Sequence, residues 1–575
     1  MLRTHTCNEI RREDIGGEAR LSGWVDTIRD HGGVIFIDLR DETGVTQVVL
    51  HDDGMLDGVN REAVVSATGK IRARDDETVN PKLDTGDVEL FADTLEILGP
   101  SRNQLPFEIR ESRDTREELR LKYRYLDLRN PDIHKNIALR SKVIKFLREK
   151  MDALGFTEIQ TPILTAPSPE GARDYLVPSR KHKGKFYALP QAPQQFKQLL
   201  MASGFDKYFQ IAPCFRDEDA RGDRSPGEFY QLDFEMAFAE QEDVLNVAET
   251  VLSDTFKEFS TFETTALPYP RITYADAMMK YGTDKPDLRN PLEICDLTNF
   301  FAEVDFPLFK GKPVRGIVAD CSGKSRSFFE SSLKFAQGIG MKGLGYLTYA
   351  DGEFKGPIEK FLSPEQKAYL VGTLGIKNGE TLFFICDSMP IVNRYAGEIR
   401  TWLGETLEII EKDAFRFCFV VDFPMYEYDA ETKGIIFTHN PFSMPQGGLD
   451  ALNFKEPTEI LAYQYDIVCN GVELSSGAVR NHSPEIMKRA FEIAGYGEET
   501  LEKQFGALYT AFSYGAPPHA GMAPGIDRMI MLLAGEDTIR DIIAFPLNGE
   551  AKDLLLGAPG EVTETQLREV HIKLR

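Results

Sequence analysis

The chain of 575 residues lacks any apolar run close to the about 18 residues that a membrane-spanning helix needs. Its first residues, MLRTHTCNEIRRED, contain no apolar stretch typical of a secretory signal. Apolar residues make up 42% of the chain and charged residues 27%, which is typical of a folded protein and excludes general disorder. We therefore expect a folded, cytoplasmic protein with no membrane partner.

Closely spaced cysteines and histidines are also missing. The seven cysteines are scattered, and the nearest two, Cys295 and Cys321, are separated by 26 positions. The nine histidines form neither an HExxH motif nor a His-x-His pair. Structural zinc sites use close pairs of such ligands, so we expect no structural transition metal and predict that the cysteines are reduced core thiols.

An excess of positive charge is absent as well. The chain has 67 lysine and arginine residues against 91 aspartate and glutamate residues, which gives a net charge of −24. A protein coated with basic residues for unspecific nucleic-acid binding is therefore excluded. Binding through one local face remains open, because only the surface that meets phosphate needs positive potential.

The first hundred residues predict a small β-barrel. Residues 18–98 contain five short segments in which apolar and polar residues alternate, and turn signals such as HGG, ETG and DTG separate them. Five strands in about eighty residues fit an OB-fold, although an SH3-like barrel would give a similar pattern.

The rest of the chain predicts a core that is interrupted by an insertion. Apolar residues recur at helical spacing over 133–154, and a predicted strand, GFTEIQTPIL, follows. Strand-rich segments occupy 186–240 and return from Phe415, whereas 285–410 is rich in glycine and phenylalanine. The predicted fold class is α+β and multidomain. The predicted segments are an OB-fold at 1–105, a hinge at 106–130, an antiparallel-sheet core at 131–284, an inserted α+β domain at 285–412, the second part of the core at 413–555 and a C-terminal extension at 556–575.

Two groups of residues are suited to binding a nucleotide. Arg216 ends a predicted strand and begins a charged loop, and Phe229 lies on the returning strand. A guanidinium can hold a phosphate there and the aromatic ring can stack a base, although an exposed hairpin loop has the same pattern. The segment GMAPGIDR (521–528) leads into a helix, where glycines and Arg528 favour an anion, and an ordinary turn before a helix is the alternative. No Walker GxxxxGK[ST] motif is present.

A third group combines two carboxylates with an arginine. Asp466 and Glu473 lie in the predicted hairpin YDIVCNGVELSSGAVR, where they are able to share a Mg²⁺ ion. Arg480, seven residues further on, is able to bind a substrate carboxylate through two parallel hydrogen bonds. A hairpin with surface charges is the alternative interpretation.

In their order along the chain, these strings resemble a known enzyme family. FRDE (215–218), GMAPGIDR and the strand ending at Pro162 are similar to the motifs of class II aminoacyl-tRNA synthetases, whose catalytic core is an antiparallel sheet. The greatest similarity is to the bacterial type of aspartyl-tRNA synthetase, in subclass b of that class. The resemblance extends over essentially the whole chain through YRYLDLR (123–129), PEGARDYLVPSR (169–180), QQFKQLLM (194–201), HNPF (439–442) and GVELSSGAVR (471–480).

The resemblance implies an enzyme that uses ATP and Mg²⁺ to convert L-aspartate to aspartyl-adenylate and transfers the aspartyl group to the 3′ end of tRNA(Asp). The implied catalytic residues are Arg216, Glu218 and Arg528. The implied ATP contacts are Arg216, Asp217, Glu218, Phe229, Glu473, Gly525, Ile526, Asp527 and Arg528. The implied aspartate contacts are Glu170, Gln194, Lys197, Arg216, Asp233, His439 and Arg480, and the implied Mg²⁺ ligands are Asp466 and Glu473.

The resemblance also assigns roles within these sets. Arg216 is expected to neutralise the α-phosphate, Phe229 to stack the adenine and Arg528 to clamp the γ-phosphate. Arg480 is expected to pair the side-chain carboxylate of aspartate with help from Lys197 and His439. Asp233 and Gln194 are expected to hold the ammonium group, and Glu170 lies in a loop expected to close over the amino acid. Such a pocket weighs against an asparaginyl or lysyl enzyme, and the retained motifs weigh against an RNA-binding relative without catalysis.

In the barrel, the resemblance implies that the anticodon is read by Arg29, Phe36, Gln47 and Glu89. By its spacing alone Phe36 is more typical of a core position, but it alternates with Ile35 and Ile37, so one of the two faces must be exposed. Homodimerisation is also implied, with the 133–154 helix and the Pro162 strand at the two-fold interface.

The sequence departs from the family pattern at two places. The loop DRSPGEF has Ser225 and Gly227 where many bacterial members have a glutamine and no extra glycine. In RDHGG, His31 replaces a leucine that is frequent in enzymes strict for tRNA(Asp). This histidine resembles the form that charges both tRNA(Asp) and tRNA(Asn), and a neutral surface substitution in a strict enzyme is the alternative.

Overall fold

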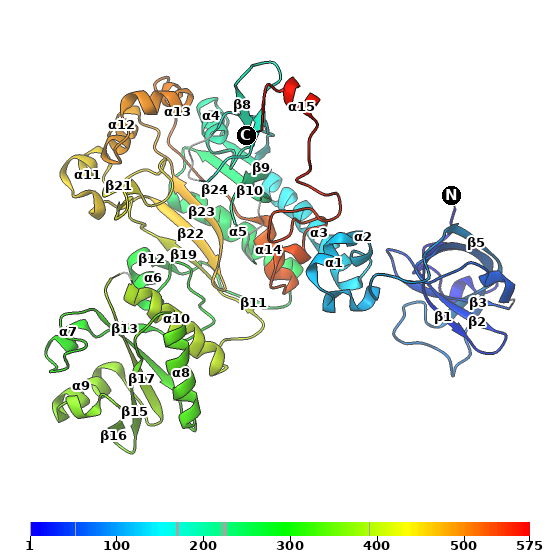
Figure 1. Ribbon diagram of the computed structural model, residues 1–575, viewed down its shortest axis with the longest axis horizontal. Helices are drawn as coiled ribbons and strands as arrows, with labels where there is room; N and C mark the ends of the chain where they lie inside the picture. The colour runs from blue at the N-terminus through cyan, green and yellow to red at the C-terminus, as the bar shows by residue number, and fades with distance from the viewer. Residues whose placement is uncertain are drawn as a thin grey trace. The chain divides into compact units, whose positions relative to one another are not determined.

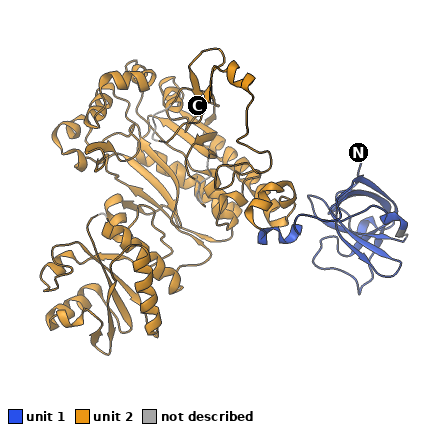
Figure 2. Ribbon diagram, in the orientation of Figure 1, with its two compact units in different colours: residues 1–115 blue, residues 116–575 orange. Residues whose placement is uncertain are grey.

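The computed structural model describes residues 2–51, 53–167, 172–219, 222, 227–389 and 391–574. The chain forms two compact units, residues 1–115 and residues 116–575 (Figure 1, Figure 2). The boundary therefore falls between Thr115 and Arg116, inside the segment that the sequence predicts as a hinge.

The first unit is a closed five-stranded barrel, as predicted. The strands pair in the order β1-β2-β3-β5-β4, and only β3 and β5 run parallel. Ile35 and Ile37 are buried in the barrel core while Phe36 between them is only half-buried, because successive side chains of a strand alternate between faces. The strands are β1 (Glu18–Asp30), β2 (Ile35–Arg40), β3 (Val45–Leu50), β4 (Val64–Ala73) and β5 (Val88–Gly99).

The second unit is built on an eight-stranded sheet in the order β12-β19-β22-β23-β24-β10-β9-β6. Its inner neighbours are antiparallel and its two edge pairs, β12 with β19 and β6 with β9, are parallel. The strands are β6 (Thr157–Glu158), β9 (Lys207–Arg216), β10 (Gly227–Ala237), β12 (Arg271–Thr273), β19 (Phe417–Val421), β22 (Gln464–Cys469), β23 (Val472–Val479) and β24 (His519–Met522).

Three helices cover this sheet and form the main core with it. They are α3 (Pro131–Ala153), α5 (Gln241–Phe259) and α14 (Ile526–Ala534). Helix α3 begins after Asn130, whose side chain accepts a hydrogen bond from the Asp132 amide, and Pro131 occupies its first turn, where a missing N–H costs nothing. Leu147, Leu252 and Ile530, one from each helix, are fully buried in the same cluster.

The strand predicted over GFTEIQTPIL is much shorter than expected. Only Thr157 and Glu158 pair with β9, and Ile159 adds one backbone hydrogen bond to Phe209. Thr161 uses its side chain to bond Gln210, and Pro162 has no N–H to offer. The prediction of a long strand here is therefore wrong.

An α+β region is inserted between the two parts of the core. Its five-stranded sheet has the order β13-β14-β17-β15-β16 and carries its own apolar clusters. Its elements are β13 (Ile294–Asp296), α7 (Thr298–Ala302), β14 (Val314–Asp320), α8 (Arg326–Gly338), β15 (Gly345–Ala350), β16 (Glu353–Lys355), α9 (Pro364–Leu374), β17 (Glu380–Cys386) and α10 (Ile391–Thr406).

Shorter elements complete the second unit, and within the described part of the chain no helix is long and apolar enough to cross a membrane. The remaining helices are α1 (Glu117–Lys122), α2 (Arg124–Asp127), α4 (Gln194–Ala202), α6 (Tyr274–Lys280), α11 (Gly448–Phe454), α12 (Pro484–Ile493), α13 (Glu498–Phe512) and α15 (Glu564–Glu569). The remaining strands are β7 (Leu176–Pro178), β8 (Phe186–Ala188), β11 (Glu263–Thr264), β18 (Ala414–Phe415), β20 (Tyr426–Asp429) and β21 (Gly434–Phe437).

Candidate active site

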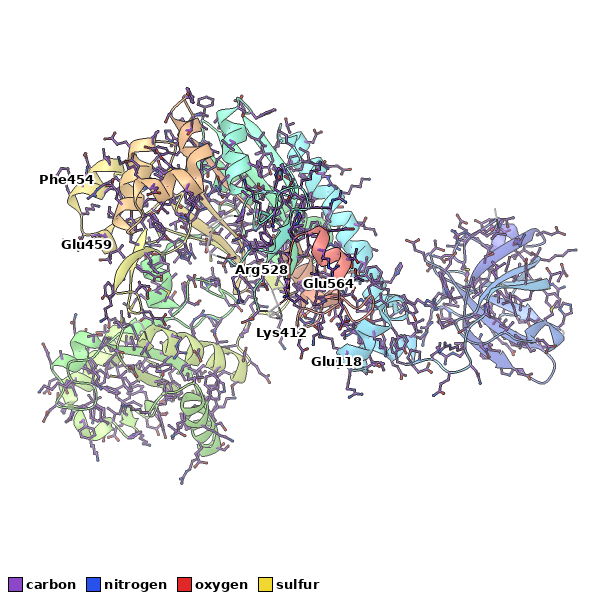
Figure 3. The ribbon with its side chains drawn as sticks, turned by 45° about the horizontal axis from the view of Figure 1, so that its top comes forward. Glu118, Lys412, Phe454, Glu459, Arg528 and Glu564 are labelled. Atoms are coloured by element: carbon purple, nitrogen blue, oxygen red, sulfur yellow. The ribbon has the colours of Figure 1, made fainter. Side chains whose placement is uncertain are left out.

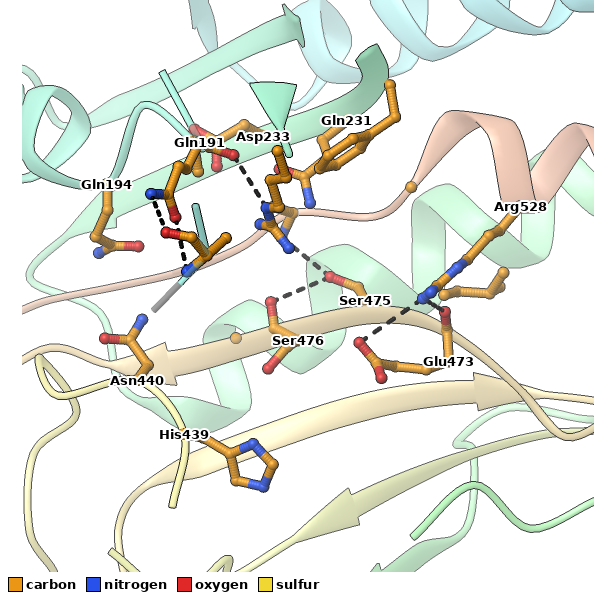
Figure 4. A pocket seen from close by; sticks show the side chains of 18 of the residues that line it. Gln191, Gln194, Gln231, Asp233, His439, Asn440, Glu473, Ser475, Ser476 and Arg528 are labelled. Atoms are coloured by element: carbon orange, nitrogen blue, oxygen red, sulfur yellow. Dashed lines mark hydrogen bonds and ion pairs between the residues drawn. The ribbon is translucent and has the colours of Figure 1, made fainter. Parts of the chain in front are cut away.

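A cavity of about 660 Å³ lies against strands β9, β10 and β23 and the start of α14 (Figure 4). Figure 3 shows that Arg528, one of the residues that line this cavity, lies in the interior of the second unit, whereas Phe454 lies at its outer edge. Most of the residues predicted for the site line this cavity although they are distant in sequence. They are Gln194, Lys197, Arg216, Glu218, Phe229, Asp233, His439, Glu473, Gly525, Asp527, Arg528 and Arg480.

One part of the cavity holds a buried network of two cations and two carboxylates. The Arg480 guanidinium donates to Glu235 from Nε (2.8 Å) and Nη2 (3.2 Å), and Nη2 also donates to the Gly521 carbonyl. Lys197 Nζ donates to Asp233 Oδ1 (2.5 Å) and lies 3.5 Å from Glu235 Oε2. All four side chains are at most 3% exposed. The network is thus pre-formed and shielded from water.

Two hydrogen-bonding atoms of this network have no partner among the described residues, and they are suited to a zwitterionic ligand. Arg480 Nη1 donates no hydrogen bond to any residue that the structure describes. Asp233 Oδ2 is buried and likewise accepts none from the described residues. One unused cationic donor and one unused carboxylate oxygen therefore line the same cavity.

Burial and pairing act in opposite directions on the two carboxylates. For Glu235, burial alone would raise the pKa, but Arg480 and then Lys197 outweigh it and hold the pKa below its usual range. For Asp233, burial prevails over Lys197 and raises the pKa. Glu235 is therefore the permanent counter-ion of Arg480.

A glycine makes the approach of Glu235 to Arg480 possible. Gly521 lies opposite Glu235 in the β10–β24 pair, and a Cβ at Gly521 would come within 2.1 Å of Glu235 Oε2. A larger residue would displace the carboxylate that holds the arginine. The first glycine of GMAPGIDR thus makes room for a side chain, in addition to the backbone freedom that the sequence suggested.

A second part of the cavity carries the groups predicted to bind nucleotide. Arg216, at the end of β9, lies over the Phe229 ring with 5.0 Å from guanidinium carbon to ring centre, and its Nε donates to the Gln191 carbonyl (3.4 Å). Glu218 lines the same cavity. Hairpin β9–β10, in which Arg216 pairs with Gly227, therefore brings a cation and an aromatic ring together.

Arg528 and Glu473 meet across the cavity (Figure 4). Arg528 Nη1, from the first turn of α14, donates to the Glu473 carbonyl and lies 3.8 Å from Glu473 Oε1. The neighbouring Asp527 is 4% exposed, and its carboxylate accepts from the Tyr230 amide (3.0 Å) and from Arg140 of α3. The Asp527 carboxylate thus connects α14 with β10 and α3.

Asp466 and Glu473 lie on the same face of the β22–β23 hairpin. Cys469 pairs with Val472 across the two-residue turn, so Glu473 lies opposite Val468, which shares the face of Asp466 two positions away. The bulge after Ile467 lies beyond this pair and gives Asp466 Ser476 as its partner. Burial, and then the negative charge of Glu473, raise the pKa of Asp466 well above its usual value.

These two carboxylates fit a Mg²⁺ ion. Asp466 Oδ1 is buried without a hydrogen bond from the described residues, and Glu473 lines the cavity beside Arg528. One or two carboxylates, with substrate phosphates and waters, are the usual ligands of Mg²⁺ at nucleotide sites. Asp466 itself is not among the residues that line the cavity.

Other predicted residues lie elsewhere. Asp217 is exposed, and its backbone exchanges hydrogen bonds with Arg173. Ile526 is fully buried in the main core. Neither side chain lines the cavity. Glu170 and Ser225 lie outside the described residues.

His439 reaches the cavity from the segment between β21 and α11, where its ring meets Phe423 edge to face at 5.0 Å (Figure 4). Burial lowers its pKa, although Asp284 and Glu473 oppose the shift. A lowered pKa keeps the imidazole neutral at pH 7, so it offers a hydrogen bond rather than a full charge.

Two functional features were missed by the sequence reasoning. Glu235 was not predicted, although it lies two residues after Asp233 on β10 and must share its face. Lys285, which lies 3.3 Å from Glu473 Oε2, was also missed because it is the first residue of the predicted insertion (285–412) and was not assigned to the core.

In the separate barrel unit, the predicted RNA contacts form one outer patch. Arg29 donates to both oxygens of Asp38 (2.7 Å each) and to Gln47 (3.1 Å), and Gln47 donates to Glu89 (2.7 Å). The His31 ring meets Phe36 edge to face at 5.6 Å. Burial raises the pKa of Glu89 despite the hydrogen bond from Gln47.

Comparison with known proteins covers both units. The family model "tRNA synthetases class II (D, K and N)" matches residues 116–549, and the model "OB-fold nucleic acid binding domain" matches residues 19–98. The chain is 55% identical to the aspartate–tRNA(Asp/Asn) ligase of Zymomonas mobilis, covering 100% of this chain and 98% of that protein. It is 54% identical, at the same coverages, to the aspartate–tRNA(Asp/Asn) ligase of Rickettsia bellii and to the aspartate–tRNA ligase of Streptomyces avermitilis.

Solved structures share the fold at low identity. The asparaginyl-tRNA synthetase of Pyrococcus horikoshii complexed with asparaginyl-adenylate gives a TM-score of 0.58 at 19% identity, over 95% of this chain and 98% of that chain. The aspartyl-tRNA synthetase of Entamoeba histolytica gives 0.56 at 18% identity, over 95% and 91%. From the family match over most of its length and from these full-length relatives, the chain belongs to the class II tRNA synthetases of the D, K and N type.

Proposed function

We propose that this synthetase activates L-aspartate with ATP and transfers it to tRNA(Asp) and tRNA(Asn). The observation that carries the choice of amino acid is Arg480: it is buried, held by Glu235, and has one guanidinium nitrogen unused among the described residues. A buried cationic donor of this kind selects a carboxylate side chain. The similarity to relatives named as ligases for aspartate supports the same choice.

The remaining groups of the network suit the rest of the amino acid. Asp233, with its unused Oδ2, takes the ammonium group, and Gln194 assists it. Lys197, tied to Asp233 and near Glu235, adds a second positive charge beside Arg480. An asparagine side chain would leave the unused guanidinium nitrogen of Arg480 and the Lys197 ammonium facing a neutral amide. A polar group left unpaired in this way excludes a competitor more strongly than the ~1–3 kcal/mol of a missing methylene.

Activation requires charge neutralisation and positioning more than proton transfer. Arg216 stabilises the negative charge that develops on the α-phosphate when the carboxylate of aspartate attacks it, and Phe229 stacks the adenine. Arg528 binds the γ-phosphate, and Glu218 holds the adenine or the tRNA end. Asp466 and Glu473 would hold Mg²⁺, which neutralises phosphate charge when bound. ATP and tRNA are cytoplasmic substrates, and the proposed place of action is the cytoplasm.

Exchange of labelled pyrophosphate into ATP tests the proposed activation step. Aspartate is expected to support exchange, while asparagine and lysine at the same concentrations support almost none. Exchange that depends on asparagine or lysine instead of aspartate would contradict the proposed selectivity. A chain without catalysis would show no exchange with any amino acid.

The barrel is proposed to read the anticodon. Phe36 is half-buried on the outer face and supplies a ring on which an unpaired base stacks, while Arg29, Gln47 and Glu89 supply hydrogen-bonding groups. His31 contacts Phe36 directly, so it lies where a change of side chain alters the base next to that ring.

Replacing His31 by leucine is expected to make the enzyme more selective. The wild-type protein should aspartylate both purified tRNAs, and H31L should lower kcat/KM for tRNA(Asn) about tenfold relative to tRNA(Asp), which is ~1.4 kcal/mol. His51→Leu is the matched control, because His51 stacks on Phe91 of the same barrel without contacting Phe36. No charging of tRNA(Asn) by the wild-type protein, or an unchanged ratio in H31L, would contradict the role given to His31.

A homodimer is proposed through the exposed face of α3 and the segment after β6. An open hollow of about 560 Å³ on α3 is lined by Ile137 and Ile144, and Ile163 and Leu164, in the segment after β6, are 48% and 54% exposed. Exposed apolar groups of this kind are suited to a protein partner, and a second copy of the chain is the proposed one.

Pro162→Gly is expected to weaken this dimer. Pro162 is exposed next to Ile163, and glycine would let the segment lose the conformation that presents those side chains. The dissociation constant from sedimentation should rise about tenfold, and activity should fall at nanomolar protein. Pro81→Gly, an exposed proline of the barrel unit, is the control. Unchanged dissociation and unchanged activity at nanomolar protein would count against the proposed interface.

A further inference from the structure

Lys285 places a positive charge at the acidic pair of the site. It lies between α6 and β13, and its Nζ is 3.3 Å from Glu473 Oε2 and 3.1 Å from Asp284 Oδ2. A lysine carries a positive charge at neutral pH, so Lys285 is an ammonium held between two carboxylates of the chain.

The two oxygens of Glu473 face different cations. Oε2 faces Lys285 at 3.3 Å, and Oε1 faces Arg528 at 3.8 Å. The ammonium is thus the nearer of these two charges. Asp466, on the same face of the hairpin, keeps Oδ1 buried and without a hydrogen bond from the described residues. One carboxylate of the pair is occupied by a lysine of the chain, and the other has an unused oxygen.

A divalent cation on this pair must compete with Lys285. Two cations a few ångströms apart repel each other, and in a partly buried site the repulsion is several times stronger than in water. ATP changes this balance, because its phosphates offer the lysine a new anionic partner. Lys285 is 38% exposed at its side chain, so it has room to leave Glu473.

We propose that Lys285 makes binding of the divalent cation depend on the nucleotide. In the empty enzyme its ammonium takes the place of the metal at Glu473, and when ATP arrives it moves to the phosphates and frees the acidic pair. The inference rests on the proposed nucleotide site, but it concerns a residue to which neither the predicted motifs nor the mechanism above gives a role. Lys285 thereby weakens metal binding without ATP and strengthens ATP binding.

A purely structural role would give different behaviour. If Lys285 only tied the segment before β13 to β23, its removal would lower stability and leave the affinity for metal unchanged or weaker. Removal of a competing cation, in contrast, strengthens metal binding. The direction of the change in metal affinity therefore separates the two roles.

The test is a titration of the full-length protein with Mn²⁺ as the probe, without ATP or amino acid, in which free Mn²⁺ is followed by electron paramagnetic resonance. Lys285→Met is expected to bind one Mn²⁺ about tenfold more tightly than the wild-type protein. The gain should disappear in Lys285→Met/Glu473→Gln, which would assign it to the acidic pair. Lys285→Arg keeps the charge and should stay close to wild type.

Lys280→Met is the matched control. Lys280 lies on α6, five positions away, where its Nζ is 4.0 Å from Glu293 and its side chain is 48% exposed. Its Mn²⁺ titration should match the wild-type titration. Calorimetry with ATP in the presence of a chelator should show about fivefold weaker binding to Lys285→Met and no change for Lys280→Met.

Equal or weaker Mn²⁺ binding by Lys285→Met would overturn the inference, as would a gain that persists in the double variant. The titration contains no amino acid and no tRNA, so it is independent of which amino acid is activated. Pyrophosphate exchange with aspartate tests the proposed function separately. Tighter Mn²⁺ binding together with absent aspartate exchange would support the role of Lys285 and contradict the choice of substrate.

Discussion

Arg480→Leu is expected to lower kcat/KM for aspartate in pyrophosphate exchange by about 10³-fold, or ~4 kcal/mol. The substitution removes the buried donor that selects the substrate carboxylate, and it leaves Glu235 buried without its main counter-ion. An uncompensated buried charge destabilises a protein by about 3–5 kcal/mol, so the melting temperature should fall as well.

A double variant separates the two effects. Arg480→Leu/Glu235→Leu removes both charges and should recover much of the lost stability while staying inactive with aspartate. Arg480→Lys keeps the positive charge but lacks the paired donors of the guanidinium, and it should lose less activity than Arg480→Leu. A double variant that regains aspartate activity together with stability would show that Arg480 acts only through folding.

Arg216→Ala is expected to lower kcat for exchange by about 10²–10³-fold with a smaller change in KM for aspartate. Its guanidinium, held by Phe229 and the Gln191 carbonyl, stabilises charge that appears on the α-phosphate during the reaction, so its loss affects the transition state more than the bound substrates. Single-turnover formation of the adenylate measures this step directly.

Phe229→Leu is the comparison for this prediction. It removes the ring but keeps Arg216, so it should raise KM for ATP and change kcat little. If Arg216→Ala raised only KM, with kcat unchanged, Arg216 would bind ATP without acting on the transition state, and the role assigned to it would be wrong.

Much of the architecture was predictable because it depends on local patterns. The barrel follows from alternating residues and turn signals over 18–98, and α3 follows from apolar spacing with Asn130 and Pro131 at its start. The strand over GFTEIQTPIL was overpredicted, since apolar composition alone does not show that Thr161 and Pro162 leave the ladder.

The site was predictable where the motif itself carries the side chain. Arg216, Arg480 and Arg528 line one cavity, as the motif order led us to expect. The common face of Asp466 and Glu473 follows from the two-residue turn at Asn470 and Gly471, which places Glu473 opposite Val468. The bulge at Ile467, which changes the partner of Asp466, has no sequence signal.

Residues whose role depends on a contact with a distant part of the chain could not be predicted from the sequence. Glu235 becomes important only because β24 places Gly521 opposite it and the end of β23 brings Arg480 near. Lys285 becomes important only because the segment between α6 and β13 folds back onto β23. Both contacts join positions that are distant in sequence, and such pairs have no periodicity to reveal them.

The most direct test of the account is to incubate the enzyme with ATP, Mg²⁺, bulk tRNA and an equimolar mixture of the twenty amino acids, and to identify by mass spectrometry the amino acid esterified to tRNA. An arginine fixed by a buried carboxylate at the substrate site should leave aspartate as the single product, attached to tRNA(Asp) and tRNA(Asn). Esterified asparagine, lysine or any other residue in comparable amount would show that this pocket does not select an anionic side chain.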